Sequence, residues 1–144
     1  MEAEGKTRRG CLTINAVDPT NGKTYEVLIS YEKMHKVCSR SKGQVLDCAK
    51  NVPYTLQHPL HIYEGLCRDE DEKESDDVGW RCYCCVPPHA YSKDGSEREP
   101  WPNQVFLVFV NAEKIAYNWY WHVCDEGSST HPKSHQTRFV KEVL

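Results

Sequence analysis

A pattern of two apolar segments joined by a short polar turn extends from Val105 to Cys124. The first segment, Val105–Val110, is apolar at every position, which predicts a central strand buried on both faces. In the second segment aromatic residues recur at every second position, and successive side chains of a strand point to opposite faces. One face, predicted to be core, carries Ile115, Tyr117, Trp119, Trp121 and Val123. The other face carries Ala116, Asn118, Tyr120, His122 and Cys124.

A second hairpin is predicted near the start of the chain. Leu12–Val17 and Thr24–Ser30 are rich in β-branched and apolar residues, and the segment Asp18–Gly22 between them contains Pro and Asn-Gly. Asn and Gly tolerate the positive φ angles that tight turns require. We therefore expect two antiparallel strands joined by this turn.

The segment Tyr31–Lys50 has a helical period instead. Its apolar residues are spaced by three, four and seven positions, and they are Met34, Val37, Cys38, Val45, Leu46 and Ala49. This spacing predicts a helix with one apolar stripe. Ser30 is a candidate N-cap, and Gly43 is a point at which the stretch can divide into two helices. Pro53 and Pro59 are expected to bracket an irregular connection.

The remaining pattern predicts two further strands and two polar connections. Leu60–Cys67 and Trp80–Val86 are the strands, and the acidic run Arg68–Val78 is the exposed loop between them. A long loop rich in Pro follows from Pro87 to Asn103, and loops of this length are often functional. The last segment, Gln136–Leu144, fits a strand or a short helix.

These elements together predict an α+β fold. We expect residues 1–144 to form a single globular domain. Its core is predicted to be an antiparallel sheet of about five to six strands with one or two helices packed on one face.

Composition narrows the function classes. The net charge of −3 and the pI of about 6.2 argue against an extended DNA or RNA contact, which would favour a basic surface. The first ten residues contain no apolar run, and no segment has the length of a membrane span. We therefore expect a cytoplasmic protein without membrane contact, in which most of the eight Cys are reduced.

A zinc-stabilised module is one alternative that the cysteines raise. Cys82, Cys84 and Cys85 lie close together, Cys67 is on the neighbouring predicted strand, and His89 follows. Zinc requires four ligands that converge on one point. Strand alternation places Cys82 and Cys84 on one face and Cys85 on the other, so buried reduced thiols are favoured. We expect no metal and no cofactor.

Two other chemical arrangements are weaker. His122 and Cys124 could form a thiol enzyme with Asn118 and Tyr120, but residues two apart on a strand are separated by roughly 6.5–7 Å. The acidic residues of Asp69–Asp77 lack the glycine and the alternation of a calcium loop. A solvated tip is expected there.

A metal-independent ribonuclease is the second functional alternative. Near the end of the chain lie His131, His135 and Arg138, residue types that can serve as acid, base and phosphate clamp. The order of a helical stretch followed by the runs HPLHIYEGL, GWRCYCC and VFLVFV-NAEK-IAYNWYW resembles the layout of small bacterial ribonuclease toxins of the RelE and ParE type. The resemblance covers roughly residues 31–124 as a pattern. It implies RNA cleavage, although those toxins are basic, lack the first hairpin and the Pro-rich loop, and share no signature residue with this chain.

The favoured function is a non-catalytic contact with a small ligand or a protein. Tyr and Trp provide large rigid surfaces with a polar tip, which suits binding. The predicted site lies between the Pro-rich loop and the polar face of the last hairpin strand. Its predicted contact residues are Tyr83, Trp101, Asn118, Tyr120 and His122.

Overall fold

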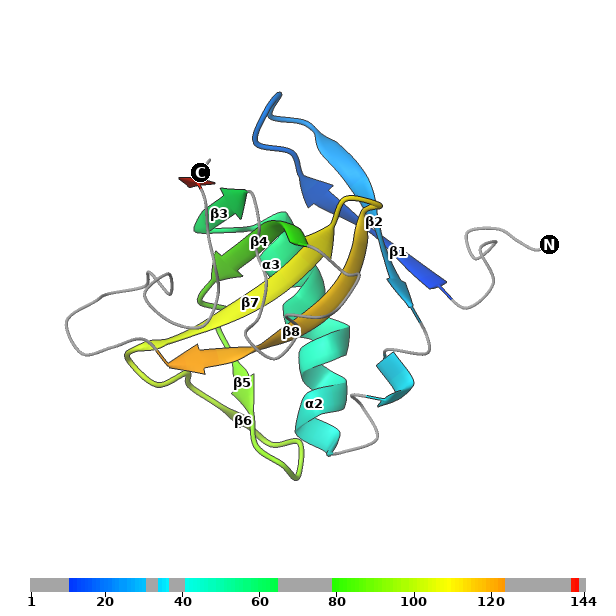
Figure 1. Ribbon diagram of the computed structural model, residues 1–144. Helices are drawn as coiled ribbons and strands as arrows, with labels where there is room; N and C mark the ends of the chain where they lie inside the picture. Colours follow the sequence, from blue (N-terminus) through cyan, green and yellow to red (C-terminus); the bar gives the residue numbers. More distant parts are fainter. Residues whose placement is uncertain (1–10, 31–33, 37–40, 65–78, 124–140, 143–144) are drawn as a thin grey trace.

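The computed structural model describes residues 11–30, 34–36, 41–64, 79–123 and 141–142. Among these residues, seven strands form one sheet in the order β1-β2-β8-β7-β4-β3-β9 (Figure 1). The strands of this sheet are β1 (Cys11–Val17), β2 (Thr24–Ser30), β3 (His61–Glu64), β4 (Gly79–Cys85), β7 (Gln104–Asn111), β8 (Ile115–Val123) and β9 (Lys141–Glu142). Two short strands, β5 (Ala90–Tyr91) and β6 (Glu97–Arg98), pair separately.

The sheet is mixed and strongly curled. β2 runs parallel to β8, where Leu28 is level with Ile115 and Ile29 with Ala116, while all other described pairs are antiparallel. The prediction of an α+β fold is confirmed, but the prediction of a purely antiparallel sheet is wrong. Antiparallel pairing was inferred from short connections, whereas most of the chain lies between β2 and β8 and acts as a crossover.

The first hairpin forms as predicted. β1 and β2 pair in register from Val17 opposite Thr24 to Cys11 opposite Ser30. In the turn, the Gly22 amide donates to the Asp18 carbonyl at 2.9 Å, and Gly22 has a φ of +73°. A residue without a Cβ adopts this φ at low cost, so the Asn-Gly pair explains the turn.

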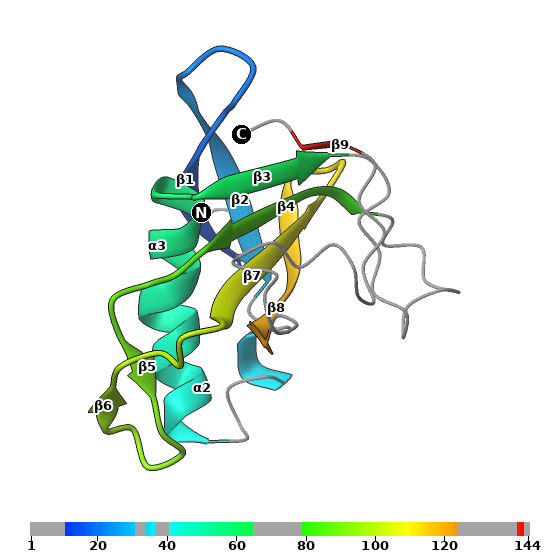
Figure 2. The ribbon, with the colours of Figure 1, turned by 90° about the vertical axis from the view of Figure 1, so that its left-hand side faces the viewer.

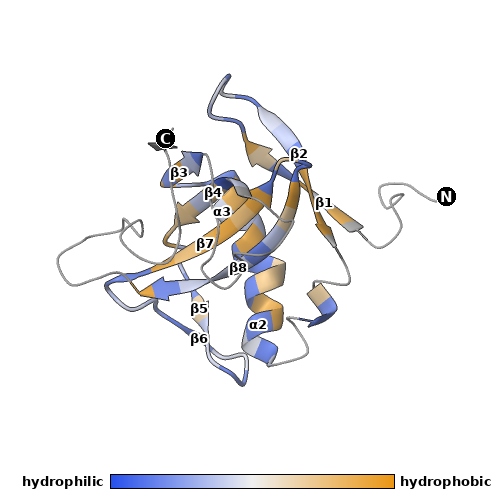
Figure 3. Cartoon of the chain, viewed as in Figure 1, coloured by the Kyte–Doolittle hydropathy of each residue, from blue (hydrophilic) through white to orange (hydrophobic). Residues whose placement is uncertain are grey.

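The strand β7 is the centre of the sheet. All eight of its residues are buried, and it lies between β8 and β4 (Figure 3). The prediction that the apolar run forms the central strand is confirmed. Apolar side chains on both faces require cover on both sides, which only an interior strand receives.

A helical turn at 34–36 lies within the predicted stretch, and the main helical region ends later than the sequence pattern predicts. Three segments follow one another: α2 (Lys42–Leu46), the π-helical turn η2 (Asp47–Asn51) and α3 (Val52–Gln57). Ser41 caps α2, and its Oγ accepts a hydrogen bond from the Gln44 amide at 3.2 Å. In the described part of the chain, no helix is long and apolar enough to span a membrane.

Pro53 does not end the helix, contrary to the predicted irregular connection. It lies in the first turn of α3, where a missing N–H costs little. The ring of a helical proline crowds the carbonyl four residues earlier. Here that carbonyl belongs to the π-helical turn, in which the Val52 amide bonds to the Asp47 carbonyl. The wider turn therefore accommodates the proline.

The larger buried cluster joins the sheet to the helix. α3 contacts β1, β4 and β7, and the helical column lies beside the strands in Figure 2. The cluster contains residues of six sheet strands and of the helical region, namely Ala16, Val27, Ile29, Cys48, Val52, Leu56, Ile62, Tyr83, Phe106, Val108, Val110, Ala116 and Trp119. A second cluster on the other side of the sheet contains Tyr63, Cys82, Cys84, Val105, Leu107, Phe109 and Tyr117.

A β-bulge changes the faces of β8. Ala116 is level with Val110 and Asn118 is level with Phe109, so Tyr117 is an extra residue between two successive pairs. Tyr117 consequently packs with Phe109 in the second cluster rather than with the tryptophans. Its predicted place on the same face as Trp119 and Trp121 is wrong, because strict alternation does not hold across a bulge.

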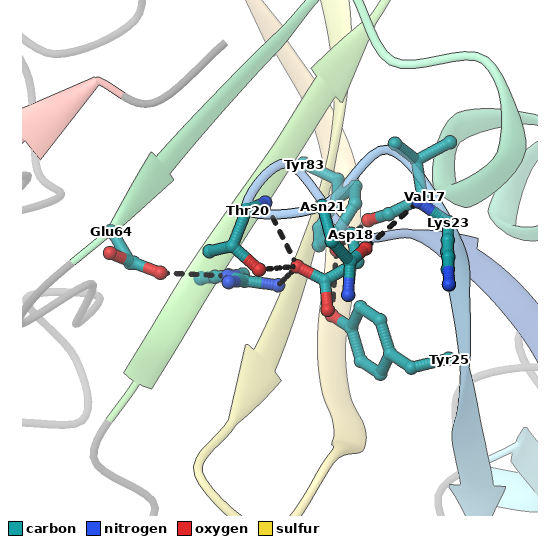
Figure 4. A network of polar contacts seen from close by, with 9 residues as sticks. Val17, Asp18, Thr20, Asn21, Lys23, Tyr25, Glu64 and Tyr83 are labelled. Carbon is teal, nitrogen blue, oxygen red and sulfur yellow. Dashed lines mark hydrogen bonds and ion pairs between the residues drawn. The ribbon is translucent and has the colours of Figure 1, made fainter.

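A network of polar contacts closes the curl of the sheet (Figure 4). The Tyr83 hydroxyl on β4 donates to the Val17 carbonyl on β1 at 2.6 Å, and it receives a 2.6 Å hydrogen bond from the Tyr25 hydroxyl on β2. Arg81 forms ion pairs with Glu64 at 2.9 Å and with Asp18 at 3.4 Å. Strands β2 and β4 are separated by β8 and β7 in the sheet, so these contacts join distant parts of it.

Arg81 is almost completely buried and is also held by aromatic rings. Its guanidinium carbon lies 4.0 Å from the centroid of the Trp80 ring and 5.6 Å from that of the Tyr25 ring. A buried charge requires partners, and the two carboxylates and two rings provide them. Burial raises the pKa of Tyr83, so its hydroxyl stays neutral and retains the proton that it donates.

Tyr83→Phe tests this closure. The variant leaves the Val17 carbonyl without its donor and Tyr25 without its acceptor, so the free energy of unfolding should fall by about 1–3 kcal/mol in urea titrations. Tyr54→Phe is the matched control, because that tyrosine is exposed on α3, and its effect should stay within about 0.5 kcal/mol. Equal stability of the two variants would contradict the proposed role of the network.

Candidate functional site

A cleft lies between the start of the helical region, the β5–β6 hairpin and the far half of β8. Figure 2 shows β5 and β6 beside α2. The side-chain amide nitrogen of Asn51 donates to the His89 carbonyl at 3.2 Å, which fixes the loop that leads into the hairpin. At Gly43 the hairpin comes so close that an added Cβ would lie 2.3 Å from the Ser92 carbonyl oxygen. The hairpin is thus held firmly against the helix.

Two adjoining cavities form the cleft and share Gln44 and Asp47 in their walls. The larger has a volume of about 410 Å³ and is lined by Ser41, Gly43, Gln44, Asp47, Tyr91 and Lys93. The smaller has a volume of about 200 Å³ and is lined by Gln44, Asp47, Phe106, Trp119, Tyr120 and Trp121. The larger volume is within the range of small-molecule sites, and the smaller is an aromatic extension of it.

Asp47 is the central polar residue of the cleft. Its Oδ1 accepts a hydrogen bond from the Asn51 amide nitrogen at 2.8 Å and one from the Trp121 indole Nε1 at 3.3 Å. Burial raises the pKa of this carboxyl group, although both hydrogen bonds and the charge of Arg98 oppose the rise. A carboxyl group with a raised pKa in a cleft is a candidate functional group.

The π-helical turn explains why Asp47 lies there. Asp47 is the first residue of this turn, and its neighbour Cys48 belongs to the core. The residue is only 9% exposed, yet it borders both cavities. Such turns occur frequently at functional sites, because the extra residue redirects a side chain.

Trp119 lines the smaller cavity and also carries an unmatched donor. The residue is only 5% exposed, and its indole Nε1 has no hydrogen-bond partner among the described residues. An unsatisfied buried donor costs about 1–3 kcal/mol. Trp121 differs, because its indole nitrogen is already used to hold Asp47.

The five predicted contact residues are not brought together at one cavity. Tyr120 lines the smaller cavity, whereas Tyr83, Trp101, Asn118 and His122 line neither of the two. Asn118, Tyr120 and His122 do share one face of β8, opposite Phe109, Leu107 and Val105 respectively.

The other two predicted contact residues lie away from that face. Tyr83 is fully buried on the opposite side of the sheet, in the closure network. Trp101 is 56% exposed, and its ring contacts the Arg98 guanidinium at 5.1 Å. The binding role of the five residues stays a prediction.

The cysteines follow the alternation that the sequence predicts. Cys82 and Cys84 belong to the second cluster, while Cys85 lies on the other face and pairs with the Thr55 hydroxyl at 3.3 Å. His89 pairs with Glu97 at 3.7 Å. No group of three or more potential metal ligands occurs within the residues described, and Cys67 lies outside them.

Several other candidate residues also lie outside the described residues. They are Cys124 of the thiol pair, the acidic run 69–77, and the ribonuclease candidates His131, His135 and Arg138. Zinc binding and RNA cleavage therefore stay predictions.

Comparison with known proteins does not change this picture. No protein-family model, no curated protein and no solved structure matches the chain. The function is therefore inferred from the geometry of the cleft.

Asp47 and its partners were not singled out by the sequence pattern. The one signal was a carboxylate that directly follows Leu46 of the predicted apolar stripe. A charged residue at the edge of such a stripe is ordinarily solvated. Only the π-helical turn and the indole of Trp121 reveal that it is buried.

The close approach at Gly43 is tested by Gly43→Ala. Alanine in a helix normally stabilises a protein by about 0.5–1 kcal/mol relative to glycine. Here the added methyl group would overlap the Ser92 carbonyl, so the free energy of unfolding should instead fall by about 1–3 kcal/mol. Lys50→Ala, at an exposed position of the same helical region, should change it by no more than about 0.5 kcal/mol. A more stable Gly43→Ala variant would refute the tight contact.

The raised pKa of Asp47 is tested by Asp47→Asn. The folded protein holds this proton more tightly than the unfolded chain, so the contribution of Asp47 to stability falls as pH rises above its ordinary pKa of 3.8. Asparagine can still accept both hydrogen bonds but does not titrate. The stability of the variant relative to the wild type should therefore increase between about pH 3.5 and about pH 7.

Asp94→Asn is the control with the opposite sign. Hydrogen bonds from the backbone and side chain of Ser96 lower the pKa of Asp94, so its contribution to stability is lost as pH falls. The stability of this variant relative to the wild type should decrease as pH rises over the same interval. Parallel pH profiles for the two variants would show that burial does not raise the pKa of Asp47.

Proposed function

We propose that the protein is a non-catalytic binding module that takes a small ligand in the cleft around Asp47. The observation that carries this proposal is a buried carboxylate shared by two adjoining cavities, with one oxygen fixed by two donors. A carboxylate fixed in this way presents its second oxygen to the cleft in one orientation. Pre-organised polar groups in a concave, partly aromatic site are typical of ligand binding.

The lining of the cleft supports binding rather than catalysis. The described residues that border the two cavities include no histidine, no cysteine and no acid besides Asp47. Nucleophilic catalysis needs an activated nucleophile beside a base, and proton transfer usually needs a second group to complete the cycle. The single carboxyl group is better suited to orient a ligand.

The chemistry of Asp47 also indicates which group the ligand presents. Both hydrogen bonds are accepted by Oδ1, so Oδ2 can accept a hydrogen bond from an N–H or O–H group of a ligand. The aromatic walls suit a flat or apolar group beside that donor. The site therefore fits a small molecule that combines a donor edge with a hydrophobic surface.

The proposal includes two further predictions from the sequence. The helices pack on one face of the sheet, and the protein is cytoplasmic. Packing is supported by Val52 and Leu56, which share a buried cluster with Phe106. A reducing location is consistent with Cys85, which is a buried free thiol.

Probe binding followed by NMR tests the proposed function. The probes are n-butylamine, guanosine 5′-monophosphate and benzoate, and the signals are the indole N–H resonances of the four Trp residues. At least one probe should shift Trp119 and Trp121 saturably, while Trp80 and Trp101, which border neither cavity, serve as internal references.

The variant Asp47→Asn should weaken the binding of that probe about tenfold or more, because a hydrogen bond to a charged group is lost. Asp94→Asn removes an equal charge from an exposed position and should leave affinity unchanged. The proposal is overturned if no probe shifts the two indole signals, or if Asp47→Asn binds as tightly as the wild type.

A further inference from the structure

We infer that the outer edge of β1 pairs with the same edge of a second copy of this chain, antiparallel and about a two-fold axis at Thr13. β1 lies at one end of the strand order, and within the described residues β2 is its only hydrogen-bonded neighbour (Figure 1). The main-chain groups along such an edge can form hydrogen bonds with another extended strand. The cleft around Asp47 takes no part in this pairing, so the inference is independent of the proposed function.

The hydrogen bonds of β2 show which groups of β1 face outward. Thr13 is opposite Leu28, and the Leu28 amide points away from β1, because it donates to the Lys114 carbonyl at 2.9 Å. Thr13 and Leu28 are therefore a non-bonded pair, and bonded and non-bonded pairs alternate along an antiparallel ladder. Every second residue of β1 thus directs its amide and carbonyl groups away from β2. These residues are Cys11, Thr13, Asn15 and Val17.

The outward groups near the start of β1 are available for pairing. The carbonyl of Val17 already accepts a hydrogen bond from the Tyr83 hydroxyl, in agreement with its outward direction. Thr13 and Asn15 are exposed, and their outward amide and carbonyl groups have no hydrogen-bond partner among the described residues. Edge strands are usually protected by a charge, a proline or a bulge. β1 contains no charged residue and no proline, and its pairing with β2 is regular.

These available groups favour one symmetric register. An axis at Thr13 places this residue opposite its own copy and Cys11 opposite Asn15 of the second copy. Each outward amide from Cys11 to Asn15 then meets a carbonyl, because the facing residues exchange both of their hydrogen bonds. An axis one residue later would engage Val17, whose carbonyl is already used by Tyr83.

The side chains of β1 also suit self-pairing. In this register Leu12, which is 43% exposed, is opposite Ile14 of the second copy, at a non-bonded pair where facing side chains lie close together. Two threonines face each other at the axis, and no like charges are opposed. A peptide from another protein would be selected by side-chain pockets beside the edge, and neither cavity described above is lined by a residue of β1.

Sedimentation equilibrium of the full chain, with a reductant present, tests the inference. The wild type should pass from 16.7 kDa to twice that mass between about 10 μM and about 1 mM, because a small interface gives a weak dimer. Thr13→Lys opposes like charges at the axis and should weaken dimerisation about tenfold or more. Thr24→Lys is the matched control at an exposed threonine of β2, and its dissociation constant should equal that of the wild type.

Charge complementation identifies the second copy as the partner. Thr13→Glu alone should dimerise as weakly as Thr13→Lys. An equimolar mixture of the two variants should recover association at least to the level of the wild type, because opposite charges then meet at the axis. In the wild type, hydrogen exchange of the Thr13 and Asn15 amides should slow as the protein concentration rises, because these amides become bonded in the dimer.

Three outcomes would contradict the inference. The wild type could stay at 16.7 kDa throughout, Thr13→Lys could dimerise as tightly as the wild type, or the mixture of variants could associate no better than either variant alone. Slow exchange of the Thr13 and Asn15 amides in a protein that sediments as a monomer would also exclude the second copy. It would show that another segment of the same chain occupies the edge.

Discussion

The rest of the structure depends on the contact between the turn of the first hairpin and the middle of β4. The hydroxyl group of Tyr83 joins the Val17 carbonyl to Tyr25, and Arg81 is held between Glu64 and Asp18. These contacts bend the sheet back on itself instead of leaving it an open twisted layer. The curl creates the hollow in which α3 contacts both β1 and β7. A buried arginine without these partners would be strongly unfavourable, so the curl and the charge stabilise each other.

The curl also explains why one parallel pair occurs in an otherwise antiparallel sheet. β2 must reach β4 with its first residues, since Tyr25 lies near its beginning. Its last residues then lie beside the start of β8, where Leu28 and Ile29 are level with Ile115 and Ala116. The parallel register is therefore a consequence of closure at the other end of β2. Local sequence patterns contain no information about it.

Much of the local structure could be predicted because it depends on neighbouring residues. The Asn-Gly turn determines the first hairpin, and the unbroken apolar run determines the central strand β7. Prediction failed where distant contacts decide the outcome. The bulge at Tyr117 depends on how β8 meets β7, and Pro53 is tolerated because a π-helical turn precedes it. The contact between Asp47 and Trp121 at the cleft could not be predicted for the same reason, since the two residues are 74 positions apart in the chain.

The cleft follows from the different extents of β2 and β8. β2 ends at Ser30, level with the first residues of β8, so within the described residues the remainder of β8 has only β7 as a hydrogen-bonded neighbour. There the helical region lies close enough for the Trp121 indole to bond to Asp47. The first hairpin thus contributes to closure at one end of the sheet and leaves space for a cavity at the other. The Asp47 carboxylate can therefore lie beside β8, at the wall of an aromatic cleft, in space that a longer β2 would have filled.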